Sequence, residues 1–282
     1  MKRFAASLPV EINAKRIDSS VGCSCRVGMK CGGFLGVLLL LLGALDARSE
    51  IPIIVIDPGH GGTSVAGSLS TRSNSSPNNA ISPGGLKEKD INLEFSMILR
   101  EVLEQEARRT GPAATIILTR EEDRNLSFIE RAAICNHPAT AAIVSIHFNA
   151  GGGGRALGSL ALIGDAKRNG NYETDHAFGE VLAEACTKGV KTFIPQSKSR
   201  GVITDGHLHG GLGSNFFYQL NQYRHLRAVP KCFLEVEFMD NPIVEETLLL
   251  RDRADKFRVI SKEIAAALLN WVDSRARNRS VP

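Results

Sequence analysis

The sequence predicts a single α/β domain with a mainly parallel or mixed twisted sheet of about six strands, flanked by helices on both faces. Short β-branched runs alternate along the chain with longer segments whose apolar residues recur at helical spacing. Strands separated by a helix are expected to run parallel through right-handed crossovers. With 282 residues, 43% of them hydrophobic, the chain is long enough to bury one sizeable core.

A targeting segment is expected over residues 1–47. The apolar run Phe34–Leu45 follows Arg26 and Lys30 and ends among small residues, which is typical of a signal peptide with a long n-region. Met29 is an alternative start for this leader. The run is shorter than the roughly 20 residues that span a bilayer, and the alternative interpretation is a buried core helix. A leader implies an exported protein, periplasmic or extracellular, with no stable membrane anchor beyond it.

The overall charge excludes few partners but argues against nucleic acid. The formal net charge is +4 and 23% of the residues are charged, as in an ordinary globular protein. No dense Lys/Arg stripe with interleaved aromatic residues is present. A mildly basic protein suits an anionic polymer such as a bacterial wall.

The cysteines do not indicate a disulfide framework. Three of them precede the apolar run of the leader, and an odd number remains after it. The remaining residues, Cys135, Cys186 and Cys232, are expected to be small buried hydrophobes.

The domain is expected to span residues 51–273 and to begin with a buried strand. Four β-branched residues, Ile53–Ile56, run directly into the turn Asp57–Gly62. The next stretch, Thr63–Gly85, is rich in Ser, Asn, Pro and Gly and is predicted to be an exposed loop. Loops of this length inside a compact domain tend to be functional or mobile.

Helices and strands then alternate. Apolar periodicity predicts helices after an N-cap at Asp90, from Ser127 to about Asn136, from Asp175 to Gly189 and from about Asp252 to Asp273. Ser127 and Glu130 form a capping box. Further strands are predicted over Ala114–Arg120, Ala141–Ala150, Gly158–Ile163 and Cys232–Phe238. The segment Lys191–Gln222 is mixed and turn-rich, and the tail, 274–282, is basic and expected to fray.

Two histidines are expected at one edge of the sheet. His60 follows the first strand within a glycine turn, and His147 ends the third strand just before a run of four glycines. Because parallel strands end at the same edge, both imidazoles are expected to emerge there. For His147, a core histidine and a metal ligand remain open interpretations.

Two glutamates, Glu88 and Glu235, are candidates to join these histidines. Glu88 lies in the turn before a helix, where a solvated charge is the alternative interpretation. Glu235 and Glu237 fall in a strongly apolar strand, where carboxylates are costly unless they are paired or at a metal. Strand alternation predicts that both point to the same face.

The candidate side chains carry a complete set of groups for amide hydrolysis. Two neutral imidazoles and one carboxylate are the ligands of a catalytic zinc that keeps one position open for water. A further carboxylate can then take a proton and deliver it to a leaving amine. His207 and His209, two apart in a glycine-flanked segment, are weaker metal-ligand candidates.

Several motifs together resemble the zinc-dependent N-acetylmuramoyl-L-alanine amidases of bacterial cell walls (type 3 catalytic domain). The resemblance covers about Ile53 to Trp271. The motifs that carry it are Asp57–Gly62, Glu88–Asp90, Thr119–Arg120, Ser145–Ala150, Leu234–Glu235 and Asn241–Pro242.

The resemblance implies a role for each matching residue. His60, Glu88 and His147 match the ligands of one Zn²⁺ per chain, and Glu235 matches the catalytic glutamate. Asn149 and Asn241, within the same motifs, are predicted to contact substrate. The implied reaction cuts the amide between N-acetylmuramic acid and L-alanine in peptidoglycan, and the protein is expected to act as a monomer.

The chain departs from the family pattern in three places. His60 and Glu88 are 28 positions apart, a wide gap that places the extra residues in the Ser/Asn loop. Glu237 replaces a small residue, and either pairs with Lys231 or Arg131 or tunes Glu235. No extra site-blocking helix is evident between Gly151 and Pro230, so the need for an activator protein stays open.

Two other functions fit part of the pattern. A zinc peptidase that cuts within the stem peptide needs the same metal ligands. A non-catalytic wall-binding module on the same fold would have no use for Glu235.

Overall fold

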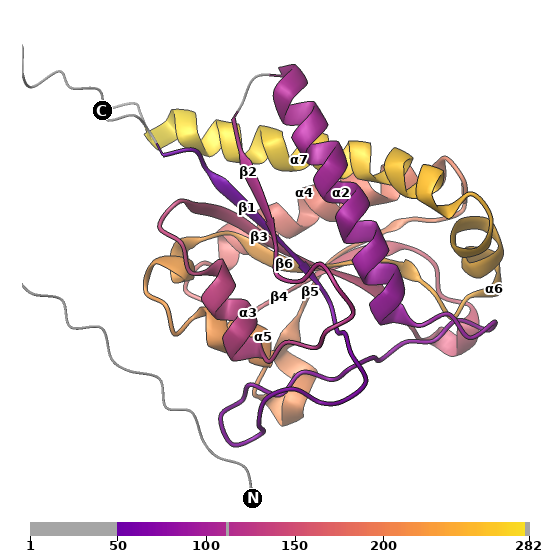
Figure 1. The fold of residues 1–282 in the computed structure, drawn as a ribbon, viewed down its shortest axis with the longest axis horizontal. Coiled ribbons are helices and arrows are strands. Elements are labelled where there is room, and N and C mark those ends of the chain that lie inside the picture. Colours follow the sequence, from indigo (N-terminus) through magenta and orange to yellow (C-terminus); the bar gives the residue numbers. More distant parts are fainter. Residues whose placement is uncertain (1–49, 111–112, 280–282) are drawn as a thin grey trace, which may run out of the picture. The chain divides into compact units, whose positions relative to one another are not determined.

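The computed structural model describes residues 50–110 and 113–279, which contain one six-stranded sheet in the order β2-β1-β3-β6-β4-β5 (Figure 1). The predicted leader lies outside the described residues. The strands are β1 (Ile53–Pro58), β2 (Thr115–Leu118), β3 (Thr140–Asn149), β4 (Ser159–Ile163), β5 (Ser199–Thr204) and β6 (Lys231–Phe238). Paired strands are parallel except β4 and β6, which are antiparallel. The predicted α/β class with a mainly parallel sheet is confirmed.

Helices cover both faces of the sheet. The helices are α2 (Glu88–Thr110), α3 (Phe128–Cys135), α4 (Tyr172–Lys191), α5 (Asn215–Leu220), α6 (Pro242–Val244) and α7 (Arg253–Arg279). A π-helical turn links α6 to α7, and short 3₁₀ turns lie at Gly152–Gly154, Asp205–Gly211 and His225–Ala228. Figure 1 shows α2, α4 and α7 on one face and the shorter α3 and α5 on the other.

The two faces of the sheet bury separate cores. Ile54 and Ile56 of β1 point into the larger core beneath α2, α4 and α7. Their neighbours Ile53 and Val55 point into a smaller core with residues of α3 and α5. A strand that is buried on both faces needs apolar residues at successive positions, which explains the continuous β-branched run. The cysteines predicted to be small buried hydrophobes are buried with free thiols, namely Cys135, Cys186 and Cys232.

β5 and α5 lie in the turn-rich segment and were not predicted. β5 is an edge strand whose residues are exposed or half-buried, so it carries no apolar run. α5 is only six residues long, too short for a periodic pattern, although Phe216 and Phe217 on it are buried.

Two helix ends differ from the prediction. α2 begins at Glu88 rather than after Asp90, so Glu88 is part of the first helical turn. α7 continues to Arg279, so most of the predicted frayed tail after Asp273 is helical. The capping box of α3 at Ser127 and Glu130 is confirmed.

The long Ser/Asn loop is fastened along its length rather than loose. Its Thr71 and Arg72 carbonyls accept hydrogen bonds from Gln219 of α5. Ser82 near its end donates to the buried Glu245 carboxylate. Ser73 inside the loop is almost fully buried. The loop is exposed over most of residues 63–71, as expected, but these contacts fix it to the domain.

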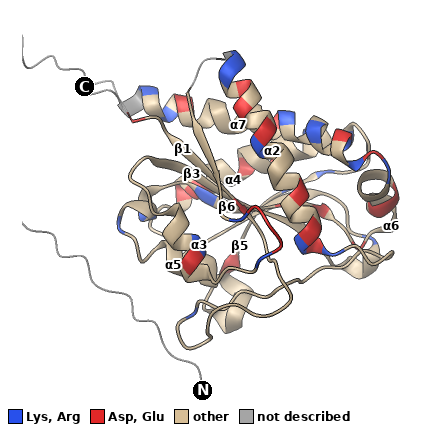
Figure 2. Ribbon diagram, viewed as in Figure 1, with Lys and Arg blue, Asp and Glu red and all other residues tan. Residues whose placement is uncertain are grey.

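The charged residues are spread without a single-sign stripe. Figure 2 shows positions of Lys or Arg and of Asp or Glu interspersed along the ribbons of α2 and α7. In the described part of the chain, no helix combines the length and apolar character that a membrane crossing requires.

Candidate active site

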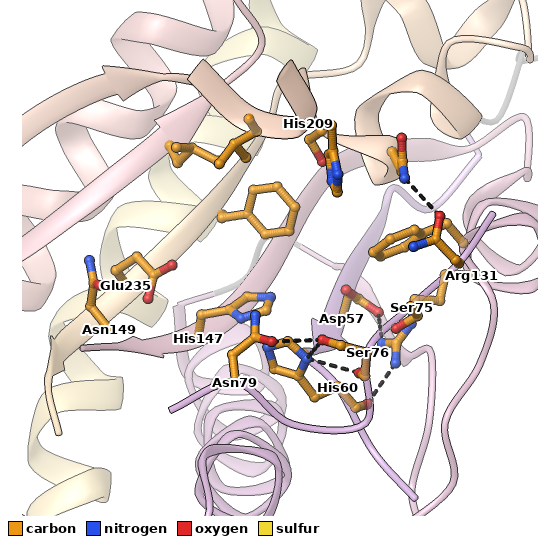
Figure 3. A pocket seen from close by; sticks show the side chains of 18 of the residues that line it. Asp57, His60, Ser75, Ser76, Asn79, Arg131, His147, Asn149, His209 and Glu235 are labelled. Carbon is orange, nitrogen blue, oxygen red and sulfur yellow. Dashed lines mark hydrogen bonds and ion pairs between the residues drawn. The ribbon is translucent and has the colours of Figure 1, made fainter. Parts of the chain in front are cut away.

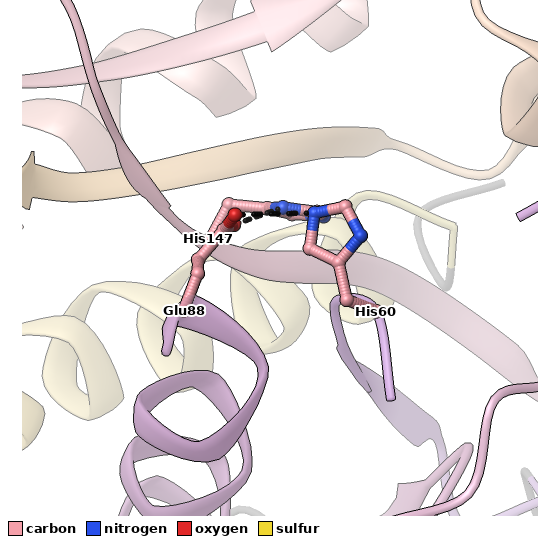
Figure 4. Close-up of side chains that lie close together, drawn as sticks. All are labelled: His60, Glu88 and His147. Atoms are coloured by element: carbon pink, nitrogen blue, oxygen red, sulfur yellow. Dashed lines mark hydrogen bonds and ion pairs between the residues drawn. The ribbon is translucent and has the colours of Figure 1, made fainter. Parts of the chain in front are cut away.

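Three predicted side chains meet at one edge of the sheet. His60 follows β1, Glu88 begins α2 and His147 lies near the end of β3 (Figure 4). One nitrogen or oxygen atom from each lies within 4.8 Å of the others. Among residues 50–110 and 113–279 this is the one group of three or more His, Cys, Asp or Glu side chains that can hold a metal ion.

The hydrogen bonds of His60 leave a nitrogen lone pair facing Glu88. His60 Nδ1 lies 3.0 Å from the carbonyl oxygen of Ser76, which can only accept. The Ser76 hydroxyl, 3.1 Å from the same nitrogen, donates its own proton to Asn79. Nδ1 therefore carries the proton, and Nε2 is a bare acceptor.

Because His60 Nε2 carries no proton, the three side chains are suited to bind a cation. His60 Nε2 is buried without a hydrogen-bond partner among the described residues, and it lies 3.3 Å from Glu88 Oε2. Two electron-rich atoms facing each other in a buried site need a positive charge between them. The hydrogen bond from His60 Nδ1 to the Ser76 carbonyl orients the ring, as the second ring nitrogen of a metal-binding histidine usually does.

Glu88 is held ionised in this buried position. Its Oε1 accepts from Asn92 and lies 2.9 Å from His147 Nδ1, and its Oε2 accepts from the Ala80 amide. Burial alone would raise the pKa of this carboxyl, but the contact with His147, followed by the contact with His60, outweighs burial and lowers the pKa well below its usual range. Burial lowers the pKa of His147, which favours the neutral, ligating imidazole.

A buried scaffold that the sequence did not reveal positions the His60 turn. Asp57 accepts from Arg131, Thr119 and Ser145, at 2.6, 2.5 and 2.6 Å. Arg131 also donates to the carbonyls of Pro58 and His60. These bonds matter because His60 adopts a left-handed backbone, with φ of 61°, that is strained for a non-glycine residue.

Gly59 gives the His147 ring its space. A Cβ atom at position 59 would lie 2.3 Å from Cε1 of His147. No side chain fits there, so the glycine before His60 is required by the second histidine. This pairing of distant positions is not visible in the sequence.

Glu235 lies on β6 next to the three-residue group. Its Cα is the register partner of His147 on the neighbouring strand. Its Oε2 is buried and has no hydrogen-bond partner in the described part of the chain. Burial, and then the negative charge of Glu88, raise the pKa of this carboxyl well above its usual range. A carboxyl of this kind is suited to proton transfer near neutral pH.

Glu237 does not join Glu235, and the predicted shared face is wrong. The register between β3 and β6 shifts just after the His147–Glu235 pair, so β6 carries a bulge there. Glu237 is fully buried and accepts from Ser197 and the Gly158 amide. The predicted pairing with Lys231 or Arg131 is also wrong, because these cations pair with Asp175 and Asp57.

The remaining predicted residues divide between the cleft and the interior. Asn149 lines the cleft beside Glu235, whereas Asn241 is buried and caps α6 by accepting from Ile243. Asn241 also donates to the Ala156 carbonyl and does not line the cleft. His207 and His209 line the cleft but are not part of the group able to hold a metal.

An open cleft of about 480 Å³ gives access to the site (Figure 3). Its floor includes His60, His147 and Glu235. Figure 3 shows His209 across the cleft from the two floor histidines, with Glu235 and Asn149 together at one end. The arrangement offers a metal position, a proton-transfer carboxyl and room for an extended substrate in one place.

Comparison with known proteins connects this site to a family. Residues 54–270 match the family model described as N-acetylmuramoyl-L-alanine amidase. The N-acetylmuramoyl-L-alanine amidase CwlM of Bacillus licheniformis is 32% identical over 100 residues, which cover 36% of this chain and 32% of CwlM. The chain spans about a third of the length of the curated relatives that it matches.

Solved structures share the fold. An N-acetylmuramoyl-L-alanine amidase from Clostridium difficile 630 aligns with a TM-score of 0.57 and 20% identity, over 80% of this chain and 100% of that chain. AmiC2 of Nostoc punctiforme aligns with a TM-score of 0.54 and 24% identity, over 79% and 97% of the two chains.

Proposed function

The chain belongs to the N-acetylmuramoyl-L-alanine amidase family, and on that premise we propose that it hydrolyses the amide between N-acetylmuramic acid and L-alanine in peptidoglycan. The observation that carries this proposal is the meeting of His60, Glu88 and His147 beside a cleft that is lined by both histidines and by the enclosed carboxyl of Glu235.

We propose that one zinc ion is held by His60, Glu88 and His147. Two imidazoles and one carboxylate match the donor set of catalytic zinc sites, and the partnerless Nε2 of His60 fits a cation. Bound zinc would supply Lewis-acid activation of a water molecule and of the amide carbonyl. The chain itself supplies the orientation, because Ser76 fixes the His60 ring and Asn92 fixes the Glu88 carboxylate.

Glu235 is the proton-transfer residue in this proposal. Its Oε2 takes a proton from the attacking water as the oxygen adds to the carbonyl carbon. The same oxygen then gives the proton to the alanine nitrogen as the carbon–nitrogen bond breaks. The second proton of the water passes from the new carboxyl group to the released amine, so the products are the lactyl carboxylate on the sugar and a stem peptide with a protonated amine, and atoms and charges balance.

The proposed function also bears on the cellular location and on the partners of the protein. A protein that acts on peptidoglycan must leave the cytoplasm, which agrees with the signal peptide expected over residues 1–47. The protein is proposed to work as a monomer, and whether an activator is needed is decided by assaying the purified chain alone.

The experiment combines metal analysis with mass spectrometry of digested sacculi, with and without a chelator. Wild-type protein is expected to contain one zinc and to release intact stem peptides that begin with L-alanine. Glu235→Gln should retain zinc and lose at least 100-fold in kcat, whereas His147→Ala should lose both metal and activity. Shortened stem peptides would indicate the peptidase instead, and a wild-type protein free of zinc would contradict the ligand assignment.

A further inference from the structure

We infer that the cleft binds its substrate in one direction, with the sugar against Asn74 and Asn79 of the long loop and the peptide against the apolar wall formed by β4, β5 and β6. This inference rests on the proposed amidase function and adds the residues that recognise the glycan. It concerns the loop where the chain has its extra residues between His60 and Glu88.

Both asparagines present a hydrogen-bond donor to the cleft. Asn79 Oδ1 accepts from the Ser76 hydroxyl at 2.8 Å, and Asn74 Oδ1 accepts from Asn215 at 3.0 Å. These contacts use each amide oxygen inside the protein and fix the orientation of each amide. Neither Nδ2 group has a hydrogen-bond partner among the described residues, and both side chains line the cleft.

The donors are held rigidly in place. Asn215, which orients Asn74, is itself fixed because its Oδ1 accepts from Arg72 Nε at 2.9 Å. Ser76, which orients Asn79, also contacts His60 through its carbonyl oxygen. Rigid donors lower the entropic cost of binding a ligand. The chain therefore orders these amides before any substrate arrives.

His209 adds a third unpaired polar group on the same cleft. Its imidazole is exposed and has no hydrogen-bond partner in the described part of the chain. Its backbone is left-handed, with φ of 47°, a conformation that is unfavourable for a non-glycine residue. Strain of this kind clusters at ligand-binding positions.

The cleft wall formed by β4, β5 and β6 is apolar, unlike the loop that carries Asn74 and Asn79. Leu160 of β4, Ile203 of β5 and Phe233 of β6 line the cleft with apolar side chains. The strand order β1-β3-β6-β4-β5 puts His147 of β3 and Glu235 of β6 between the loop after β1 on one side and strands β4 and β5 on the other. Uncharged amide donors match the hydroxyl and acetamido oxygens of a sugar. The methyl group of alanine matches the apolar side.

The test compares two substrates that differ only in the sugar. One is a disaccharide carrying N-acetylmuramic acid and a tripeptide, and the other is the same tripeptide acylated with D-lactate alone. Asn79→Asp keeps the acceptor for Ser76 but replaces the free donor with an acceptor. We expect the ratio of kcat/KM for the sugar-bearing substrate to that for the sugar-free substrate to fall about tenfold, as for one lost hydrogen bond.

Asn74→Asp provides an independent second variant, because it keeps the acceptor for Asn215. Asn270→Asp, on the exposed side of α7, adds the same charge away from the cleft and should keep the wild-type ratio. Zinc content is measured in every variant. An unchanged ratio in both loop variants, or a loss that is equal for the two substrates, would overturn the inference while leaving the amidase function intact. A wild-type protein that cleaves neither substrate would overturn both.

Discussion

At the scale of single residues, the site depends on a buried ion pair beneath it. Asp57 and Arg131 are almost fully buried, and Arg131 joins Asp57 to the carbonyls of the His60 turn. Burial would raise the pKa of Asp57, but the charge of Arg131 and hydrogen bonds from Ser145 and Thr119 outweigh it and lower the pKa. A lowered pKa means that the ionised form stabilises the fold.

We therefore expect Asp57→Asn to destabilise the protein by about 3 kcal/mol at pH 7, because Arg131 loses its partner in a buried place. The stabilisation from Asp57 is complete above its unfolded-state pKa of about 3.9 and is lost as the pH falls through the lower folded-state value. Urea unfolding at several pH values checks this. The difference in the free energy of unfolding between wild type and variant should become smaller only at acid pH. A difference that does not change with pH would contradict the role of the Asp57 charge.

At the scale of elements, Arg72 joins the two segments that border the cleft. Its guanidinium donates to the Leu212 and Gly213 carbonyls and to Asn215, and it lies over the Tyr218 ring at 4.1 Å. One side chain thus ties the Ser/Asn loop to the stretch that carries His209. Of the two interpretations left open for this loop, functional or mobile, these contacts favour an ordered wall of the cleft.

Arg72→Ala should loosen both segments without unfolding the domain. Hydrogen exchange of the amides in 63–76 and 205–215 is expected to speed up about tenfold, as for the loss of one to two net hydrogen bonds. The global unfolding midpoint should change little. Arg108→Ala, at an exposed position near the end of α2, is the matched control. Unchanged exchange in both segments would show that the loop is fixed by its other contacts.

At the scale of the whole molecule, the proposed metal would link segments that are far apart in the chain. His60 follows β1, Glu88 begins α2 and His147 lies on β3, and these elements belong to one sheet and the helix packed on it. A ligand that binds only the folded state stabilises all of these elements together.

Zinc at 100 times its dissociation constant should add about 2.7 kcal/mol and raise Tm by about 5–10 °C. Differential scanning calorimetry with zinc, and again after chelation, measures the shift. The His147→Ala variant should show no zinc-dependent shift. An equal rise in the Tm of that variant on adding zinc would mean that zinc binds at a different site.

The sequence by itself determined the fold class, the order of most elements and the residues that form the floor of the cleft. This was possible because buried strands and amphipathic helices leave periodic apolar patterns, and because the sharp turn after β1 carries His60 to the sheet edge. β5 and α5 were missed because an exposed edge strand and a six-residue helix leave no such pattern.

Only the tertiary structure decided how the polar residues are used. It showed that Asn241 caps a helix, that Glu237 is buried away from the cleft, and that Arg131 supports the His60 turn. A polar side chain in a sequence has no direction of its own. The partner of such a side chain depends on which distant segment packs against it. For Glu237, a single bulge in β6 changed the segment that the side chain contacts.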